Sequence, residues 1–429
     1  MVATRYPAGG QALTPAQQQA LAMQQAQAQK DQNRAFMALS INKKALAQQA
    51  NGGANNQAFV AGQPLTYNVP TANNGYLVGF WVNCQLVNTL AAGAGAVYAL
   101  NAEAPLSLID SIVVNYGGPQ HNFRPYILKY YFQMLGALSM TFPRQILAGQ
   151  LDTFMQAYYA SVNTGIFPVA VGANTWNFRF FVPMNLIHPQ DVRGILPIQN
   201  GETTCQIVIN CAGAPYGPDP TLHTVVTTSG TGGASAVTGT VSVEAVYKDG
   251  QSYSQLTALQ PNMSGIQTAQ LVRDTPLMNL GSGQMFRNKV SFLHKIPWLW
   301  IAVIDGNQSS KLAATSNIQV IETSADATGM RPFMRYGQNT NLDARSYYDD
   351  LVRLLQNDMD EGLIPLVYGP IFQQADASLL EGQHYLDMTT QSGWTDFHYG
   401  VQLNTVGAVA GINPRIEAHA ILLNDPLVM

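Results

Sequence analysis

The chain has 429 residues, enough to bury more than one core, and only 11% of them are charged, well below the roughly 25% usual in soluble globular domains. Its net charge of −4 gives no indication of general nucleic-acid binding by the body. The sequence contains no apolar run of the about 18 residues that a transmembrane helix needs. The N-terminus lacks the apolar segment of a secretory signal peptide. So little charge indicates either a surface of neutral polar side chains or, the interpretation we favour, faces that are buried between subunits.

The first fifty residues predict a long helix, or two helices joined near Asn33. Thr14 is a favourable N-cap residue and Pro15 suits the first helical position. Strong helix formers, mainly Ala and Gln, follow without Gly or Pro over residues 16–50, and Gly52 and Gly53 supply the stop.

This helical arm is basic, whereas the rest of the chain is acidic. Residues 1–50 carry five basic residues and one acidic residue, and the remaining residues carry 16 basic and 24 acidic. We therefore expect the arm to dock onto a negative surface or a neighbouring subunit through Lys30, Arg34, Lys43 and Lys44. The alternative is a helix packed on its own body, or a partly disordered leader.

After Gly53 the chain changes to short β-rich runs separated by Gly, Pro and Asn, which predicts a first β domain. The segments 124–140 and about 146–159 have helical spacing, and residues 91–96 and 212–238 are expected loops. The predicted strands of this block are Leu65–Val69, Tyr76–Val87, Leu106–Tyr116, Thr175–Val182, Thr204–Asn210 and Val241–Tyr247.

A second block repeats this order of strands, a helix and further strands, although no sequence repeat is found. Its predicted helix is Ser346–Met359. Its predicted strands are Ala269–Asp274, Val290–Leu293, Trp298–Ile304, Ile318–Thr323, Pro365–Tyr368, Thr395–Leu403 and Arg415–Leu423. The fold class is therefore all-β with a few helices, as two tandem jelly-roll β-sandwiches. The expected units are an N-terminal helical arm (1–53), a first jelly roll (54–247), a linker (248–270) and a second jelly roll (271–429).

Residue patterns that would carry catalysis are weak throughout the chain. The seven histidines form no HxH or HExxH pattern, no GxSxG elbow occurs, and the glycine-rich segments 230–233 and 281–283 lack the context of a phosphate loop. The cysteines, three in number and without a CxxC pair, are expected to be buried thiols. We therefore predict no enzyme activity, no catalytic residues, no metal site and no cofactor.

Two other functions stay open at this point. An acidic cluster at residues 349–361 would suit a carbohydrate-active or carbohydrate-binding tandem β-sandwich if two carboxylates faced each other across an aromatic-lined groove. A solvated helix face or a weak cation contact between subunits is the simpler interpretation of this cluster. A secreted bacterial structural protein is a weaker third class, because no signal sequence is seen. The aromatic clusters are expected to lie mainly in the core, with some at a subunit interface.

Several segments resemble the major capsid protein of tailless, membrane-containing icosahedral phages of the tectivirus type. The Gln/Ala-rich leader Leu13–Gln29 resembles the leader of that coat protein. Further similar segments lie between and within the two blocks, at Val241–Tyr247, Gln251–Tyr253, Gln255–Leu256 and Ile301–Gly306.

The resemblance implies two jelly rolls standing side by side, perpendicular to an icosahedral shell, in a homotrimer with a pseudo-hexagonal outline. It places the N-terminal helix beneath the shell, near an internal membrane and neighbouring capsomers, with loops projecting outward as towers. It also implies penton and minor capsid proteins as partners, location in the virion, assembly in the host cytoplasm, and no direct binding of the genome.

Overall fold

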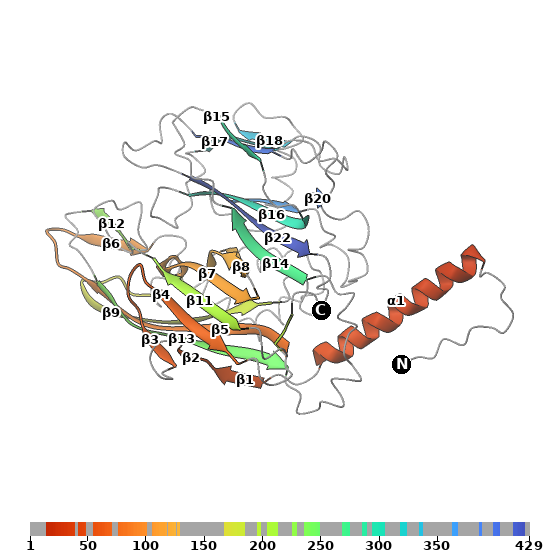
Figure 1. Ribbon diagram of the computed structural model, residues 1–429. Helices are drawn as coiled ribbons and strands as arrows, with labels where there is room; N and C mark the ends of the chain where they lie inside the picture. The colour runs from red at the N-terminus through yellow and green to blue at the C-terminus, as the bar shows by residue number, and fades with distance from the viewer. Residues whose placement is uncertain are drawn as a thin grey trace.

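The computed structural model contains one long helix and a set of antiparallel sheets (Figure 1). The residues that the structure describes are 14–38, 42–48, 55–70, 76–100, 105–117, 119–125, 127–128, 167–184, 195–198, 204–212, 225–229, 236–248, 268–274, 285–289, 294–304, 318–323, 334–337, 363–367, 386–387, 398–403 and 415–424.

The outer sheet of the first sandwich is built on two long strands that alternate between core and surface. In β5, Phe80, Val82 and Cys84 point into the core, because successive side chains of a strand lie on opposite faces. β13 and β9 pair with β5 on its two sides, and short strands complete the sheet. The members are β1 (Asn42–Ala45), β3 (Asn56–Ala58), β13 (Ala236–Lys248), β5 (Tyr76–Leu90), β9 (Gly172–Pro183) and β10 (Leu196–Pro197).

The inner sheet of the first sandwich covers the other side of this core. Tyr67, Ile112 and Ile207 are fully buried against the outer sheet. The strands, in spatial order, are β2 (Ala47–Gln48), β4 (Pro64–Val69), β11 (Cys205–Cys211), β7 (Ile109–Tyr116) and β8 (Pro119–Phe123). A separate two-stranded antiparallel sheet of β6 (Val97–Leu100) and β12 (Val225–Ser229), which are distant in the sequence, lies at one end of this sandwich.

The second sandwich repeats the plan with two further sheets. Its inner sheet contains β14 (Thr268–Asp274), β22 (Arg415–Asn424), β16 (Lys295–Ile304), β19 (Leu363–Val367) and β20 (Leu386–Asp387). Its outer sheet contains β15 (Met285–Lys289), β21 (His398–Leu403), β17 (Ile318–Thr323) and β18 (Met334–Gly337).

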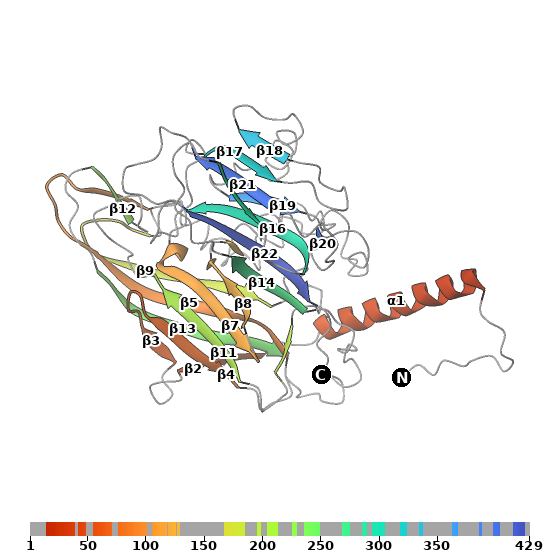
Figure 2. The same cartoon turned by 45° about the horizontal axis from the view of Figure 1, so that its top comes forward.

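The two sandwiches lie side by side (Figures 1 and 2), and their buried apolar residues form a shared cluster. The edge strand β14 runs next to the edge strand β8. Trp300, Ala302 and Ile421 of the second sandwich belong to the same continuous core cluster as the residues of the first. The fold is therefore all-β, with two tandem jelly-roll sandwiches and an N-terminal helix, as the sequence predicts.

The arm differs from its prediction in one respect: α1 runs only from Pro15 to Ala38. Its start is as expected, because the Gln17 N–H donates to Thr14 Oγ1 (3.4 Å) and the Thr14 N–H donates to Gln17 Oε1 (3.0 Å), a capping box. The helix predicted to reach Ala50 is wrong, because residues 42–48 form β1 and β2. Tertiary pairing overrides helix propensity in this segment.

Two other predictions need correction. The predicted strand Leu106–Tyr116 begins as a 3₁₀ turn at Leu106–Leu108, and the strand itself starts at Ile109. The expected loop 212–238 contains β12 and the first residues of β13. The helices predicted near 146–159 and at 346–359, the strand Val290–Leu293 and nearly all of 124–140 and of the linker lie outside the described residues. The domain boundaries stay a prediction.

Candidate functional site

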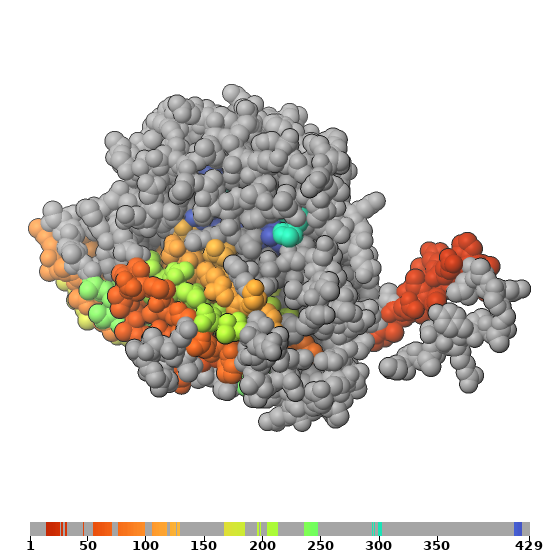
Figure 3. Space-filling view, viewed as in Figure 1, coloured from red at the N-terminus to blue at the C-terminus, as the bar shows by residue number. Residues whose placement is uncertain are grey.

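Helix α1 extends away from both sandwiches (Figures 1 and 3). Its described side chains are exposed, and Met23 keeps 64% of its surface accessible. These residues therefore do not pack on the body of their own chain. Ala and Gln dominate the helix, so it offers a long polar surface with little apolar area of its own.

The four basic residues of the predicted docking site fall in two different elements. Lys30 and Arg34 lie in the C-terminal half of α1. Lys43 and Lys44 lie in β1, where their backbones pair with Val246 and Ala245 of β13. The sequence predicted helical structure for all four residues, as one helix or two joined near Asn33, but the structure places only Lys30 and Arg34 in a helix.

The segment after the helix is fastened to both sheets of the first sandwich. β1 pairs with β13 of the outer sheet, and β2 pairs with β4 of the inner sheet. Leu46, between these two strands, is 1% exposed, and its N–H donates to the Val243 carbonyl at 2.9 Å. A force on the segment preceding residue 42 would thus be transmitted to both sheets through backbone pairing and a buried side chain.

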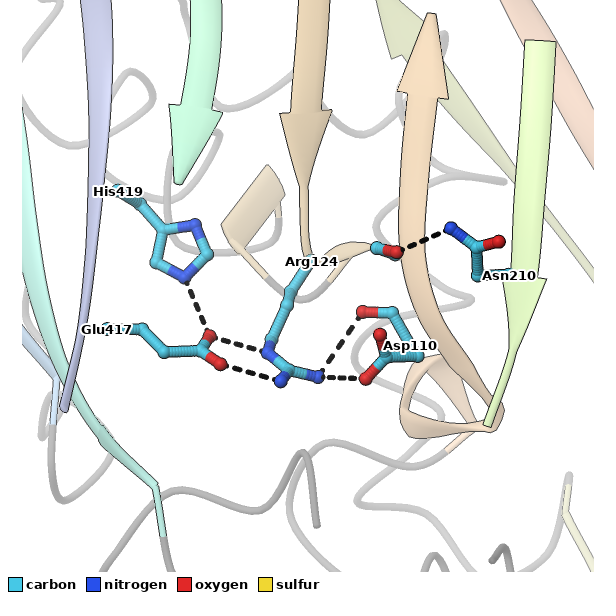
Figure 4. A network of polar contacts seen from close by, with 6 residues as sticks. Asp110, Arg124, Asn210, Glu417 and His419 are labelled. Carbon is cyan, nitrogen blue, oxygen red and sulfur yellow. Dashed lines mark hydrogen bonds and ion pairs between the residues drawn. The ribbon is translucent and has the colours of Figure 1, made fainter. Parts of the chain in front are cut away.

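A buried network of charges joins the two sandwiches (Figure 4). Arg124, which follows β8, donates from Nε to Glu417 Oε2 at 2.5 Å and from Nη2 to Glu417 Oε1 at 2.6 Å. Its Nη1 donates to Asp110 Oδ1 at 2.6 Å. Arg124 and Glu417 are 2% and 0% exposed. This bidentate pair connects the first sandwich to β22 of the second with charge-assisted hydrogen bonds.

The surroundings of Glu417 favour its charged form. Burial alone would raise the pKa of this carboxyl, but the Arg124 guanidinium and the neighbouring His419 together hold the pKa well below the usual range. His419 Nε2 lies 3.2 Å from Glu417 Oε2, and its side chain is fully buried. The junction is therefore held by an ionised carboxylate at neutral pH.

The outward face of the outer sheet of the first sandwich carries an aromatic cluster with an arginine. The Arg179 Cζ lies 3.9 Å from the centre of the Trp81 ring, and the Phe181 ring is tilted against Trp81 with centroids 5.2 Å apart. Phe181 reaches across Gly79, where an added Cβ would come within 2.3 Å of the Phe181 ring. Trp81, Arg179 and Phe181 are all partly exposed. We call this surface, together with Glu244 on β13, the Trp81 face.

The reactive side chains of the described part are enclosed rather than grouped in a site. The three cysteines are buried and free, as expected, and burial raises the pKa of the Cys205 and Cys211 thiols to about 12. Burial lowers the pKa of His121 to about 3. Among the described residues no group of His, Cys, Asp and Glu could hold a metal ion, and no helix is long and apolar enough to cross a membrane.

Most of the other sequence candidates lie outside the described residues. These are the acidic cluster at 349–361 and the glycine-rich segments 230–233 and 281–283. The expected core aromatics of β9 are confirmed in part: Trp176, Phe178 and Phe180 are buried, whereas Phe181 is partly exposed.

Sequence reasoning missed both the junction network and the Trp81 face. A signal existed for the first: Arg124 and Glu417 are isolated charges beside or within apolar runs in a chain that has few charges. A charge in such a place indicates a buried partner but does not say which one.

Comparison with known proteins identifies the fold. No family model matches the chain, and no curated protein matches its sequence. Among solved structures, the major capsid protein of STIV has a TM-score of 0.54 at 11% identity, covering 90% of this chain and 98% of that one. The atomic structure of Sulfolobus Turreted Icosahedral Virus matches with a TM-score of 0.52 at 10% sequence identity. The match covers 90% of this chain and 92% of that chain. The crystal structure of PBCV-1 VP54, fitted into a cryo-EM reconstruction of the virophage Sputnik, matches with a TM-score of 0.51 at 10% sequence identity. The match covers 90% of this chain and 94% of that chain.

These likenesses extend over nearly the whole chain, so they compare both sandwiches at once. At this level of identity they show the fold alone. The chain has the double jelly-roll fold of viral major capsid proteins, which confirms the expected resemblance at the level of the fold.

Proposed function

We propose that this chain is a viral major capsid protein that assembles with copies of itself into a homotrimer and then into an icosahedral shell over an internal membrane. The observation that carries the proposal is the double jelly roll with a long exposed helix fastened to both sheets of the first sandwich. Where the side chains of this helix are described, they are exposed and do not pack on either sandwich, so the helix is free to bind something outside its own chain. It suits attachment to a neighbouring capsomer or to a membrane.

The low charge content supports the same function. Capsid subunits cover much of their surface with copies of themselves, and neutral polar rims allow that burial without stranded charges. In this proposal the protein is structural and has no enzymatic activity. Its further partners are penton and minor capsid proteins, and its place is the virion, after assembly in the host cytoplasm.

The described carboxylates favour this function over carbohydrate cleavage. A glycosidase needs two carboxyl groups facing a sugar across an open cleft. Asp110 and Glu417, which converge in the described part, are instead both bonded to Arg124 at the junction between the sandwiches. They hold the protein together rather than line a groove.

The test of assembly is native mass spectrometry and negative-stain imaging of the purified full chain. We expect trimers with a pseudo-hexagonal outline at micromolar concentration. A stable monomer over the same range would refute the proposal.

The basic residues of the arm are the proposed contact with lipid headgroups. Near an anionic membrane each Lys or Arg adds about 1 kcal/mol of attraction. Because the structure separates them, two variants are needed: Lys30→Gln with Arg34→Gln in α1, and Lys43→Gln with Lys44→Gln in β1. We expect the helix variant to float less with vesicles containing anionic lipid, and neither variant to change flotation with neutral vesicles.

Flotation that is unchanged in both variants would exclude the membrane as the docking surface. If shell assembly were lost at the same time, the arm would instead contact the next capsomer.

A further inference from the structure

The described sheets of the two sandwiches stay separate where the sandwiches meet. The edge strands β8 and β14 run next to each other, but each belongs to a sheet of its own sandwich. In the described part no backbone ladder joins these sheets across the boundary. Such a ladder would fix the register, because a shift by one residue turns every side chain to the other face. The placement of one sandwich against the other therefore depends on side chains.

The apolar side chains at this boundary carry little directional information. Ala302 pairs with Glu417, so both side chains lie on the face of the inner sheet that meets the first sandwich. Trp300 and Ile421 lie on the same face, because each is an even number of positions away along its strand. All three apolar residues belong to the core cluster shared with the first sandwich. Hydrophobic attraction is non-directional and roughly proportional to buried area, so placements that bury the same area have similar free energies.

The ion pair between Arg124 and Glu417 is directional, in contrast. The guanidinium is planar, and its two hydrogen bonds of 2.5 and 2.6 Å hold the carboxylate in one position and one plane. Asp110 holds the other side of the same guanidinium, through Oδ1 at 2.6 Å and through its carbonyl oxygen at 3.3 Å (Figure 4). Because Asp110 belongs to β7, this bond orients Arg124 within its own sandwich.

A slip of β22 along the boundary would break this pair. Moving the strand by two residues keeps the same face inward and puts His419 or Arg415 in the place of Glu417. Arginine has no hydrogen-bond acceptor, and an imidazole has at most one acceptor nitrogen, so neither accepts both bonds. Arg124 and Glu417 are 2% and 0% exposed, so the slipped arrangement would strand two buried charges.

We infer that the Arg124–Glu417 pair is an orientation lock, which selects one placement of the two sandwiches and contributes little to their net stability. Buried ion pairs can often be replaced by apolar residues without loss of stability, which indicates that specificity is their contribution here. The consequence for assembly rests on the proposed self-assembly. Identical subunits close into a symmetric oligomer when all have the same shape, so subunits with several placements would close poorly.

Distances between spin labels on the two sandwiches test the inference. The label sites are Val60, which is 50% exposed after β3, and the partly exposed His294 before β16, changed as Val60→Cys with His294→Cys. The three native cysteines are buried, so brief labelling of the full chain selects the two new sites. Labelled copies are mixed with a large excess of unlabelled copies. Double electron–electron resonance then reports distances within one chain.

Three variants are compared in this labelled background, in which the intact pair should give one narrow distance peak. Arg124→Met with Glu417→Met should lose that single peak and give a broad or split distribution. Arg124→Lys should broaden the peak less, because lysine keeps the charge but lacks the planar fork. The control Ser111→Ala removes a 2.8 Å bond from Asn210 that lies within the inner sheet of the first sandwich, and should keep the narrow peak.

The outcomes decide the inference. A folded double variant that keeps the narrow peak overturns it, because apolar packing alone would then fix the placement. Circular dichroism with thermal melting verifies folding. If the double variant does not fold, Arg124→Lys decides: a broadened peak supports the inference, and an unchanged peak overturns it.

These outcomes also separate the inference from the proposed function. A chain with the intact pair that gives one narrow peak but stays monomeric overturns the capsid function and leaves the orientation lock standing. Trimers formed by a double variant with the narrow peak do the reverse. If both proposals hold, negative-stain images should show fewer closed trimers for the double variant than for the intact pair.

Discussion

The buried ion pair between Arg124 and Glu417 gives the sharpest stability prediction. Glu417 is 0% exposed and accepts two charge-assisted hydrogen bonds from a guanidinium that is itself 2% exposed. Replacing Glu417 with Ala removes both bonds and leaves the Arg124 guanidinium buried without its bidentate partner, although its bond to Asp110 remains. Removing one member of a buried pair costs about 3–5 kcal/mol, most of which is the uncompensated charge. We expect Glu417→Ala to lower the free energy of unfolding by that amount.

A double variant separates the charge effect from simple loss of packing. Arg124→Met with Glu417→Met replaces the pair by apolar side chains, and such replacements are often neutral or stabilising by about 1–4 kcal/mol. The assay is urea unfolding with calorimetry at one fixed protein concentration, because association also shifts stability. A loss below about 1 kcal/mol for Glu417→Ala, or a double variant less stable than that single variant, would refute the reasoning.

The pH dependence of this pair has a defined sign. The folded-state pKa of Glu417 lies well below its ordinary value of 4.5, so its contribution to stability is complete above pH 4.5 and is lost as the pH falls towards the folded pKa. Wild-type protein should therefore lose stability on acidification below pH 4.5 more steeply than Glu417→Gln.

Three further predictions follow from buried or crowded positions. Because burial lowers the pKa of His121 from 6.5 to about 3, folded protein should lose on the order of 1 kcal/mol per pH unit between those values, and His121→Leu should flatten that slope in pH-dependent melting. Gly239→Ala should cost about 1–3 kcal/mol in urea unfolding, since Gly239 has φ +129° and an added Cβ would lie 2.2 Å from the Gln85 carbonyl oxygen; an unchanged midpoint would contradict this. A thiol reagent should label native protein far more slowly than unfolded protein, because Cys84, Cys205 and Cys211 are buried and their thiol pKa values are raised; rapid labelling of the native chain would show that the core opens.

The sequence predicted most of the strands because their signal is local. Alternation of apolar and polar residues over β5, β11 and β13 reflects a core on one face, and this pattern can be read without knowing the partner strand. The start of α1 was predicted for the same reason, since the capping box involves only Thr14 and Gln17.

The end of the helix and the junction were not predictable in this way. Residues 42–48 have helix-forming side chains, and they become strands because β13 and β4 offer backbone partners while Leu46 enters the core. Arg124 and Glu417 are 293 positions apart, so nothing local connects them.

The sequence by itself determined that this protein is a pair of β-sandwiches with a helical arm and few charges. Tertiary structure alone decided which surfaces are covered. Trp81 lies on β5 of one sheet and Trp300 on β16 of another, yet Trp81 is partly exposed and Trp300 is fully buried. The physical reason is that exposure depends on what lies against a sheet, and a strand's own residues specify its faces but not its neighbours.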